Sequence, residues 1–329
     1  MKRSLKNLLW AAACVVVLSS TPSGTGLRAQ ARFEAGIAVG PSNFLGDLGG
    51  NFGRGTPFFK DNNVELTRLM KGAFVSFSPK PFINIRASLN MGKLEGADSI
   101  IKPRGGHEMT RIERNLHFRS PVYEALLTAE FYPTVFLEDD QDDVYRKLRP
   151  YFVIGVGGFR FNPQGQYVDQ NGNKTWVDLR PLRTEGQGMP SHPERKEYSL
   201  TQINIPYGVG FKYFVSDRIN IGFELVIRST FTDYIDDVST KYIPDQDFYD
   251  FFGPNTFQAD MAVKMANMSN LTVQSNTRTS FTGTEQRGEP LNDDSYYASS
   301  FKMGIRLGRG ESRYMRGAQE RLRCPIVRF

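Results

Sequence analysis

The chain has 329 residues and a formal net charge of +6, and 23% of its residues are charged. Its two cysteines exclude a disulfide-rich scaffold, and after residue 31 no run of eighteen apolar residues could form a membrane-spanning helix. The first 31 residues contain no acidic residue and four basic ones, Lys2, Arg3, Lys6 and Arg28. Removal of this segment would therefore lower the net charge from +6 to +2. The charge of the mature chain therefore gives no indication of nucleic-acid binding, which we do not expect.

Residues 1–31 have the three-part form of a secretory signal peptide. A basic start precedes an apolar run at residues 8–18, which is shorter than the roughly 20 residues that a helix needs to cross a bilayer. Small residues at Ala29 and Ala31 predict cleavage there. Lipidation at Cys14 is the less favoured alternative, because the apolar run continues beyond it.

Apolar residues alternate with polar or small residues along eight segments of the mature chain. Between residues 218 and 228, for example, Ile219, Ile221 and Phe223 oppose Asn220, Gly222 and Glu224. Period-two alternation is the pattern of a strand that lies between lipid and a polar interior. In chain order, the alternation predicts strands at residues 33–40, 71–77, 83–91, 123–131, 151–161, 203–213, 218–228 and 296–307.

The connections between these segments alternate in length. The links at 78–81 and 215–217 are tight, whereas those at 41–69, 92–117, 162–197 and 231–294 are long; only the link at 133–149 departs from the alternation. Bacterial outer-membrane barrels have short periplasmic turns and long extracellular loops. The sequence thus predicts an eight-stranded antiparallel outer-membrane β-barrel over residues 32–308, in contact with outer-membrane lipid, followed by a periplasmic basic tail over residues 309–329.

Charged residues gather on the non-apolar face of the predicted strands. A soluble β-sandwich or a lipocalin-like barrel is the alternative fold, but it would place such a face outward and the apolar face inward. A lipid-facing position would not tolerate these charges, while a small barrel interior can hold them as compensating pairs. We therefore predict a lumen filled by a charge network of Glu34, Arg86, Glu124, Glu130, Arg160, Lys212, Glu224, Arg228, Lys302 and Arg306.

The sequence offers little for catalysis. Its three histidines, His107, His117 and His192, lie in no recognised catalytic or metal-binding spacing. The carboxylate pairs Asp236-Asp237 and Asp293-Asp294 fall in the longest loop, where we expect solvated turns. We therefore expect no enzyme activity, no cofactor, no metal site and no small-molecule substrate.

Two segments outside the predicted strands carry concentrated charge. The acidic link contains Glu138, Asp139, Asp140, Asp142 and Asp143. Its spacing does not match an EF-hand calcium loop, so a solvated turn or a docking surface for a basic partner is favoured. The tail is rich in arginine and has a single cysteine, with Arg313, Arg316, Arg321, Arg323 and Cys324 as candidate docking residues. The alternative is a tail that has no docking role.

Three stretches together resemble a known family. Residues 40–50 (GPSNFLGDLGG), residues 114–134 (RNLHFRSPVYEALLTAEFYPT) and the Cys324-Pro325 pair resemble the Bacteroidota outer-membrane barrels that include PorG of the type IX secretion system. The resemblance implies a structural or assembly role, in which the barrel anchors a periplasmic ring complex to the outer membrane. A surface binding or adhesion barrel that acts through its extracellular loops is the alternative function, and a hydrolytic barrel is a third.

Overall fold

The structure is a computed structural model that describes residues 32–48, 64–101, 108–137, 147–169, 171–216, 218–254, 256–269, 283 and 285–307. The chain divides into two units, Met1–Gln30 and Ala31–Phe329, and every described residue belongs to the second. The predicted signal peptide at residues 1–31 and the predicted tail at residues 309–329 lie outside the described residues.

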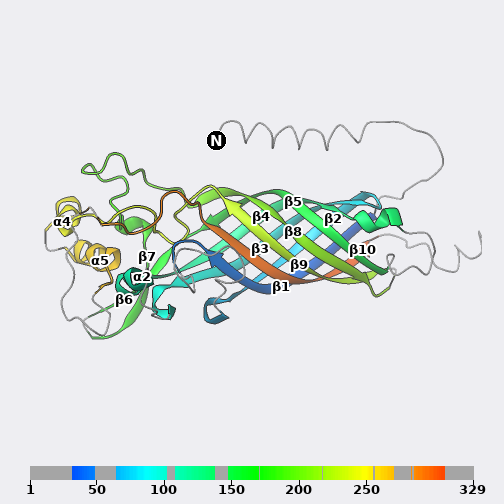
Figure 1. The fold of residues 1–329 in the computed structure, drawn as a ribbon, viewed down its shortest axis with the longest axis horizontal. Helices are drawn as coiled ribbons and strands as arrows, with labels where there is room; N and C mark the ends of the chain where they lie inside the picture. The colour runs from blue at the N-terminus through cyan, green and yellow to red at the C-terminus, as the bar shows by residue number, and fades with distance from the viewer. Residues whose placement is uncertain are drawn as a thin grey trace, which may run out of the picture. The chain divides into compact units, whose positions relative to one another are not determined.

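Eight long antiparallel strands form a closed barrel (Figure 1). Their order around the wall is β3-β2-β1-β10-β9-β8-β5-β4, and a further pairing between β3 and β4 closes the ring. The predicted eight-stranded antiparallel barrel is therefore confirmed. The strands are β1 (Arg32–Leu45), β2 (Arg68–Lys80), β3 (Ile83–Ala97), β4 (His117–Phe131), β5 (Leu148–Phe161), β8 (Thr201–Phe214), β9 (Ile219–Thr230) and β10 (Ser295–Leu307).

Several strands extend further than the alternation predicted, and they do so at the end with the long loops. β4 begins at His117, where the sequence predicted a start at Tyr123, and it pairs with β3 as far as Ala97. Ser120 and Pro121 interrupt the apolar alternation in this stretch. Only the part of a barrel that lies in the membrane needs apolar side chains on its outer face. Beyond that part the strands remain paired, although the alternation of apolar and polar residues ends.

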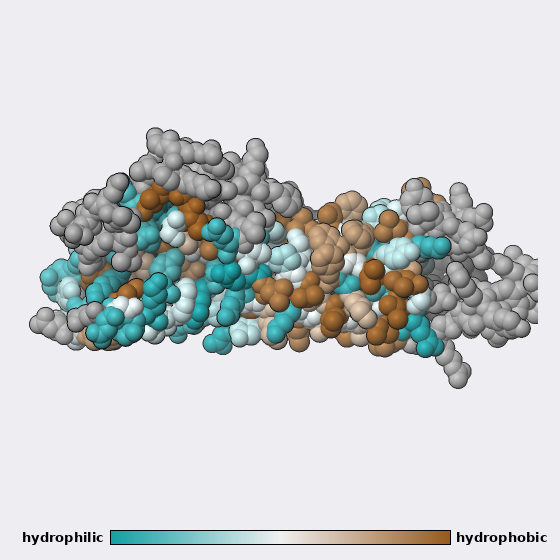
Figure 2. Space-filling model, turned by 90° about the horizontal axis from the view of Figure 1, so that it is seen from below, coloured by the Kyte–Doolittle hydropathy of each residue, from teal (hydrophilic) through white to brown (hydrophobic). Residues whose placement is uncertain are grey.

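The outward side chains of the barrel form an apolar surface. Val75, Leu127, Ile154, Ile203 and Phe301 are each more than half exposed. Figure 2 shows hydrophobic side chains across the barrel and mostly hydrophilic ones at the end that carries the loops. Such a surface is unfavourable in water, and a closed barrel has its backbone groups paired within the wall, as lipid requires. The chain is an outer-membrane β-barrel.

The inward face is polar and crossed by a few aromatic rings. A Cβ atom at Gly36 would lie 2.5 Å from the ring of Phe74, and one at Gly210 would lie 2.6 Å from the phenol of Tyr151. Glycine on one strand therefore leaves room for an aromatic side chain from another. The lumen is filled by side chains, as expected for a barrel of this size. No helix of the described residues is long and apolar enough to cross a bilayer.

The four long connections gather at one end of the barrel, and we call their described residues the cap (Figure 1). No helix or strand was predicted in these loops. The cap contains the hairpin β6 (Gln164–Val168) and β7 (Lys174–Asp178), together with α2 (Glu108–Arg114), α4 (Asp245–Phe252) and α5 (Phe257–Ala266). Short 3-10 turns occur at η2 (Val64–Leu66), η3 (Asp98–Ile100) and η5 (Arg180–Leu182), and η4 (Pro133–Leu137) lies in the link at the opposite end.

The cap contains a hydrophobic core. Ile235 and Phe248 are completely buried, and Met265 on α5 is 2% exposed. These residues belong to one cluster with Phe118 and Phe161, which point inward from β4 and β5. The apolar core of the cap thus continues into the end of the lumen that lies next to the long loops. The cap is therefore a folded layer over this end of the barrel.

Candidate functional site

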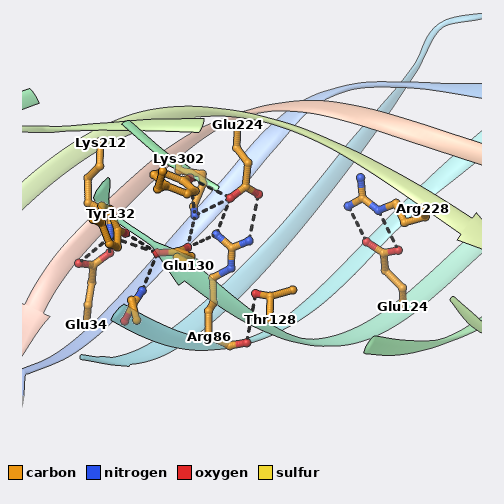
Figure 3. A network of polar contacts seen from close by, with 12 residues as sticks. Glu34, Arg86, Glu124, Thr128, Glu130, Tyr132, Lys212, Glu224, Arg228 and Lys302 are labelled. Atoms are coloured by element: carbon orange, nitrogen blue, oxygen red, sulfur yellow. Dashed lines mark hydrogen bonds and ion pairs between the residues drawn. The ribbon is translucent and has the colours of Figure 1, made fainter. Parts of the chain in front are cut away.

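An ion-pair network fills the middle of the lumen (Figure 3). Arg86 Nη1 lies 2.6 Å from Glu130 Oε1 and 2.7 Å from Glu224 Oε2. Lys302 Nζ lies 3.2 Å from each of the same two carboxylates. Asn84 and Tyr132 donate further hydrogen bonds to Glu130, which has no exposed surface. Two basic residues and two acidic residues are thereby held together by β3, β4, β9 and β10.

A second and a third pair lie on either side of this centre. Lys212 Nζ lies 3.1 Å from Glu34 Oε1, towards the start of β1. Towards the cap, Arg228 Nη2 lies 2.8 Å from Glu124 Oε1, and the hydroxyl group of Tyr296 donates to the other oxygen of Glu124. The pairing therefore runs along much of the barrel.

Charge is balanced within the buried network. Four carboxylates face four basic groups, and the eight residues are between 0% and 8% exposed: Glu34, Glu124, Glu130, Glu224, Arg86, Lys212, Arg228 and Lys302. A cavity of about 30 Å³ remains beside Arg86, Arg228 and Lys302, which is room for ordered water and not for a solute. The network thus fills the lumen at this level of the barrel.

Two predicted network residues lie elsewhere. Arg160 is exposed on the outer face, because Phe159 and Phe161 on either side of it point inward into the core. Glycines on β5 had left the facing of this strand ambiguous in the sequence. Arg306 is half-buried at the end of β10 opposite the cap, where its guanidinium lies 4.0 Å from the ring centroid of Phe214. Arg160 was wrongly predicted to face the lumen, whereas Arg306 lies at the rim of the barrel opposite the cap.

The described histidines have structural partners. Nε2 of His117 accepts a hydrogen bond from the backbone N–H of Gln166, which ties β4 to the hairpin. His192 Nε2 lies 2.8 Å from Asp247 Oδ2, between the third and the fourth long loop. His107 lies outside the described residues. As they lie, no three acidic, histidine or cysteine side chains of the described part of the chain are arranged to hold a metal ion.

A buried ion pair organises the centre of the cap. Arg287 Nη1 lies 2.9 Å from Glu185 Oε1, and the same group donates to the backbone carbonyl of Asp237. Glu185 also accepts from the backbone N–H groups of Ser239 and Thr240. Burial raises the pKa of Asp237 to about 6, and the charge of Arg287 limits that rise. The third and the fourth long loop are thus joined by charges that water does not reach.

A second acidic group lies where the first loop meets the fourth, and we call Asp47, Asp233, Asp236 and Asp294 the acidic clasp. The prediction of solvated turns is wrong for Asp236, Asp237 and Asp294, which are 1%, 0% and 0% exposed, whereas Asp293 is exposed. The pKa of Asp233 is raised to about 8, first by burial and then by the charge of Asp47. Burial and neighbouring carboxylates also raise the pKa of the other three. Only the hydrophobic sequence around Asp47 and Asp236 could have indicated this burial.

The predicted docking residues cannot be placed. The acidic link with Glu138, Asp139, Asp140, Asp142 and Asp143 lies outside the described residues. The same holds for the tail residues Arg313, Arg316, Arg321, Arg323 and Cys324. Their role in docking stays a prediction.

Residues 12–260 match the model of a family described as a domain of unknown function, DUF6089. The chain belongs to this family. The match spans part of the predicted signal peptide, the first seven barrel strands and most of the cap. No curated protein matches the chain in sequence.

Several solved structures are similar in fold. Ail, the attachment invasion locus protein of Yersinia pestis, crystallised with the heparin analogue sucrose octasulfate, is 7% identical with a TM-score of 0.31, and the match covers 84% of this chain and 99% of that one. Neisserial surface protein A is 8% identical with a TM-score of 0.33, covering 84% and 96% of the two chains. The outer membrane protein AlkL, in a solid-state NMR structure in lipid bilayers, is 10% identical with a TM-score of 0.30, covering 89% and 98% of the two chains.

Proposed function

We propose that this DUF6089 barrel is a structural or assembly component that anchors a periplasmic ring complex of the type IX secretion system to the outer membrane. The observation that carries the proposal is the closed lumen. In the part of the chain that the structure describes, paired charges fill the middle of the lumen and the cap lies over its mouth, an arrangement that disfavours passage of a solute or a polypeptide. A barrel with a filled lumen is suited to anchoring a partner complex at the membrane and not to transport through its interior.

The stretches that resemble PorG-like barrels support this role. Residues 40–50 and 114–134 meet at the base of the cap, where Arg114 Nη2 donates to the backbone carbonyl of Asp47 at 2.9 Å. Arg114 also forms an ion pair with Asp98 at 2.7 Å. The residues that carry the resemblance thus connect the first two long loops. Such contacts stabilise the structure of the cap.

The docking surface that we propose lies on the periplasmic side. There η4 leads directly into the acidic link and exposes Phe136 and Leu137, which are 65% and 59% exposed. The ring of Phe136 lies 5.4 Å from that of Phe82 and 6.3 Å from that of Phe131, between ring centroids. These contacts fix the point at which the link leaves the barrel wall, close to the membrane surface.

A pull-down from detergent-solubilised outer membranes tests the proposal. Two variants are needed: deletion of residues 309–329, and replacement of the five acidic link residues by their amides. We expect both proteins to insert and to run as folded barrels on unheated gels, while recovery of the periplasmic ring components falls sharply. Amide substitutions at the exposed cap residues Asp250 and Asp260 are the matched control and should leave recovery unchanged. Undiminished recovery with both docking variants would contradict the proposal.

The folded cap favours a second candidate, a surface binding or adhesion protein. The cap exposes Phe257 and Leu291, which are 66% and 86% exposed, on the outside of the cell. Cross-linking on intact cells followed by mass spectrometry separates the two functions. Adhesion would be favoured over anchoring if cross-linked partners were found only at residues 231–294 and if deletion of residues 309–329 left recovery of the ring components unchanged.

A further inference from the structure

Three basic side chains lie on the outer face of the barrel wall, near the cap end of β2, β3 and β5. We call them the basic belt: Lys71, Lys93 and Arg160. All three are exposed and follow the outward alternation of their strands. The outward side chains of β8, β9 and β10 include neither lysine nor arginine. Positive charge is therefore gathered on one side of the wall.

The basic belt forms no ion pair within the part of the chain that the structure describes. Glu95, the next outward residue of β3 towards the cap, pairs with Arg68 instead. Arg119 on β4 is not part of the belt, because its Nε donates to Gln164 and its guanidinium lies 4.1 Å from the ring centroid of Trp176. Basic side chains on the lipid-facing wall are unfavourable unless they reach an anionic group, so the belt favours an anionic lipid.

The strand register places an aromatic residue within the basic belt. Tyr123 on β4 pairs with Arg160 on β5 and with Met91 on β3, and it is 58% exposed. Met91 pairs in turn with Lys71. Tyrosine is typical of the level at which lipid headgroups meet the hydrocarbon, and a lysine just below that level can extend its ammonium group up to it. Because the long loops of such barrels are extracellular, the belt lies at the headgroups of the outer leaflet.

A groove of about 660 Å³, which we call the wall groove, lies in the outer face of β2 to β5 on the side of the belt away from the cap. Ala73, Ala125 and Gly158 line it, and the register pairs Ala125 with Gly158. Ala73 is the next outward residue after Lys71, and Gly158 is the one before Arg160. The groove therefore begins where the belt ends, at the depth that acyl chains occupy below their headgroup.

We propose that the basic belt and the wall groove together bind a phosphorylated glycolipid of the lipid A class, with its phosphates at the belt and an acyl chain in the groove. Lys93 and Arg160 lie on strands that only β4 separates, which places them roughly 10 Å apart across the wall. Two phosphates at the ends of a disaccharide can reach both residues, whereas a lipid with a single phosphate reaches one. Tyr123 lies between them and offers its ring to the sugar.

Native mass spectrometry of the full-length protein tests this proposal. The protein is purified in detergent, freed of lipopolysaccharide and titrated with diphosphoryl lipid A or, separately, with zwitterionic phosphatidylethanolamine. We expect the wild type to bind lipid A with the lower apparent Kd, because only lipid A has a net negative charge and two phosphates for the basic belt to contact.

Lys93→Gln combined with Arg160→Gln removes two charges of the belt and leaves the wall groove intact. We expect the apparent Kd for lipid A to rise about 25-fold, because each basic residue near an anionic lipid contributes roughly a factor of five to binding. The Kd for phosphatidylethanolamine should not change. Lys196→Gln combined with Lys241→Gln removes two exposed charges from the cap and is the matched control, which should bind both lipids as the wild type does.

Ala125→Leu fills the wall groove and keeps the charges of the belt. We expect it to raise the apparent Kd for lipid A several-fold, because the acyl chain loses its place on the wall. Ala129→Leu is the matched control, since Ala129 points outward from the same strand but does not line the groove. Its Kd for lipid A should equal that of the wild type.

An unchanged Kd for lipid A in the Lys93→Gln, Arg160→Gln protein, when it runs as a folded barrel on unheated gels, would overturn the proposal. Equal Kd values of the wild type for the two lipids would do the same. A wild type that is dimeric in detergent and becomes monomeric on Ala125→Leu would place a second copy of the chain in the groove and also overturn it. If the double variant fails to fold, the two single variants replace it, each with an expected rise in Kd of about fivefold.

Discussion

Glu130 has no exposed surface and contacts basic residues from two other strands, Arg86 on β3 and Lys302 on β10. Replacement by alanine leaves these cations buried without their shared carboxylate. Removal of one member of a buried ion pair costs about 3–5 kcal/mol, because the remaining charge stays out of water. We therefore expect Glu130→Ala to lower the free energy of unfolding of the barrel by about that amount, as measured by urea titration of protein refolded in detergent.

Arg160→Ala provides the control for that measurement. Arg160 has the same charge as Arg86 but lies exposed on the outer face of β5. Its removal should change the free energy of unfolding by no more than about 0.5 kcal/mol, as is usual for an exposed side chain. Equal effects of Glu130→Ala and Arg160→Ala would show that the lumen network does not stabilise the barrel.

At the scale of elements, α4 and the barrel strands should respond separately to mutation. Phe248 on α4 is completely buried in the core of the cap, and truncation of a buried phenylalanine costs about 3–5 kcal/mol. We expect Phe248→Ala to increase hydrogen exchange throughout the cap while the eight barrel strands keep their protection. Phe257→Ala on α5, at a side chain that is 66% exposed, should leave the exchange of the cap unchanged. Loss of protection in the strands would mean that barrel and cap unfold as one unit.

For the whole molecule, the filled lumen predicts an absence of conduction. Balanced ion pairs fill the middle of the lumen, and the cavity of about 30 Å³ beside them has room only for ordered water. Wild-type protein in planar lipid bilayers should therefore carry no steady ionic current, whereas open porins of larger strand number do. A stable conductance that scales with salt concentration would contradict both the closed lumen and the argument for an anchoring role.

Much of the fold followed from local pattern. Alternation along segments such as 218–228 predicted the barrel strands. Successive side chains of such a strand face lipid and the polar lumen in turn, so apolar and polar residues must alternate. The same rule predicted the inward facing of Glu34, Glu130, Lys302 and five other charged residues that the structure buries. The alternation of short and long links predicted the topology.

The sequence by itself thus determined the strands, their order and the polarity of the two faces, since these depend on the solvent that each side chain meets. Only the tertiary structure decided which charges pair, because Arg86 and Glu224 are 138 residues apart and meet through barrel closure. It also decided the outward facing of Arg160, which glycines on β5 had concealed. Finally, it showed that Asp236 of the acidic clasp is buried, because this carboxylate loses contact with water only when the first and the fourth loop fold onto each other.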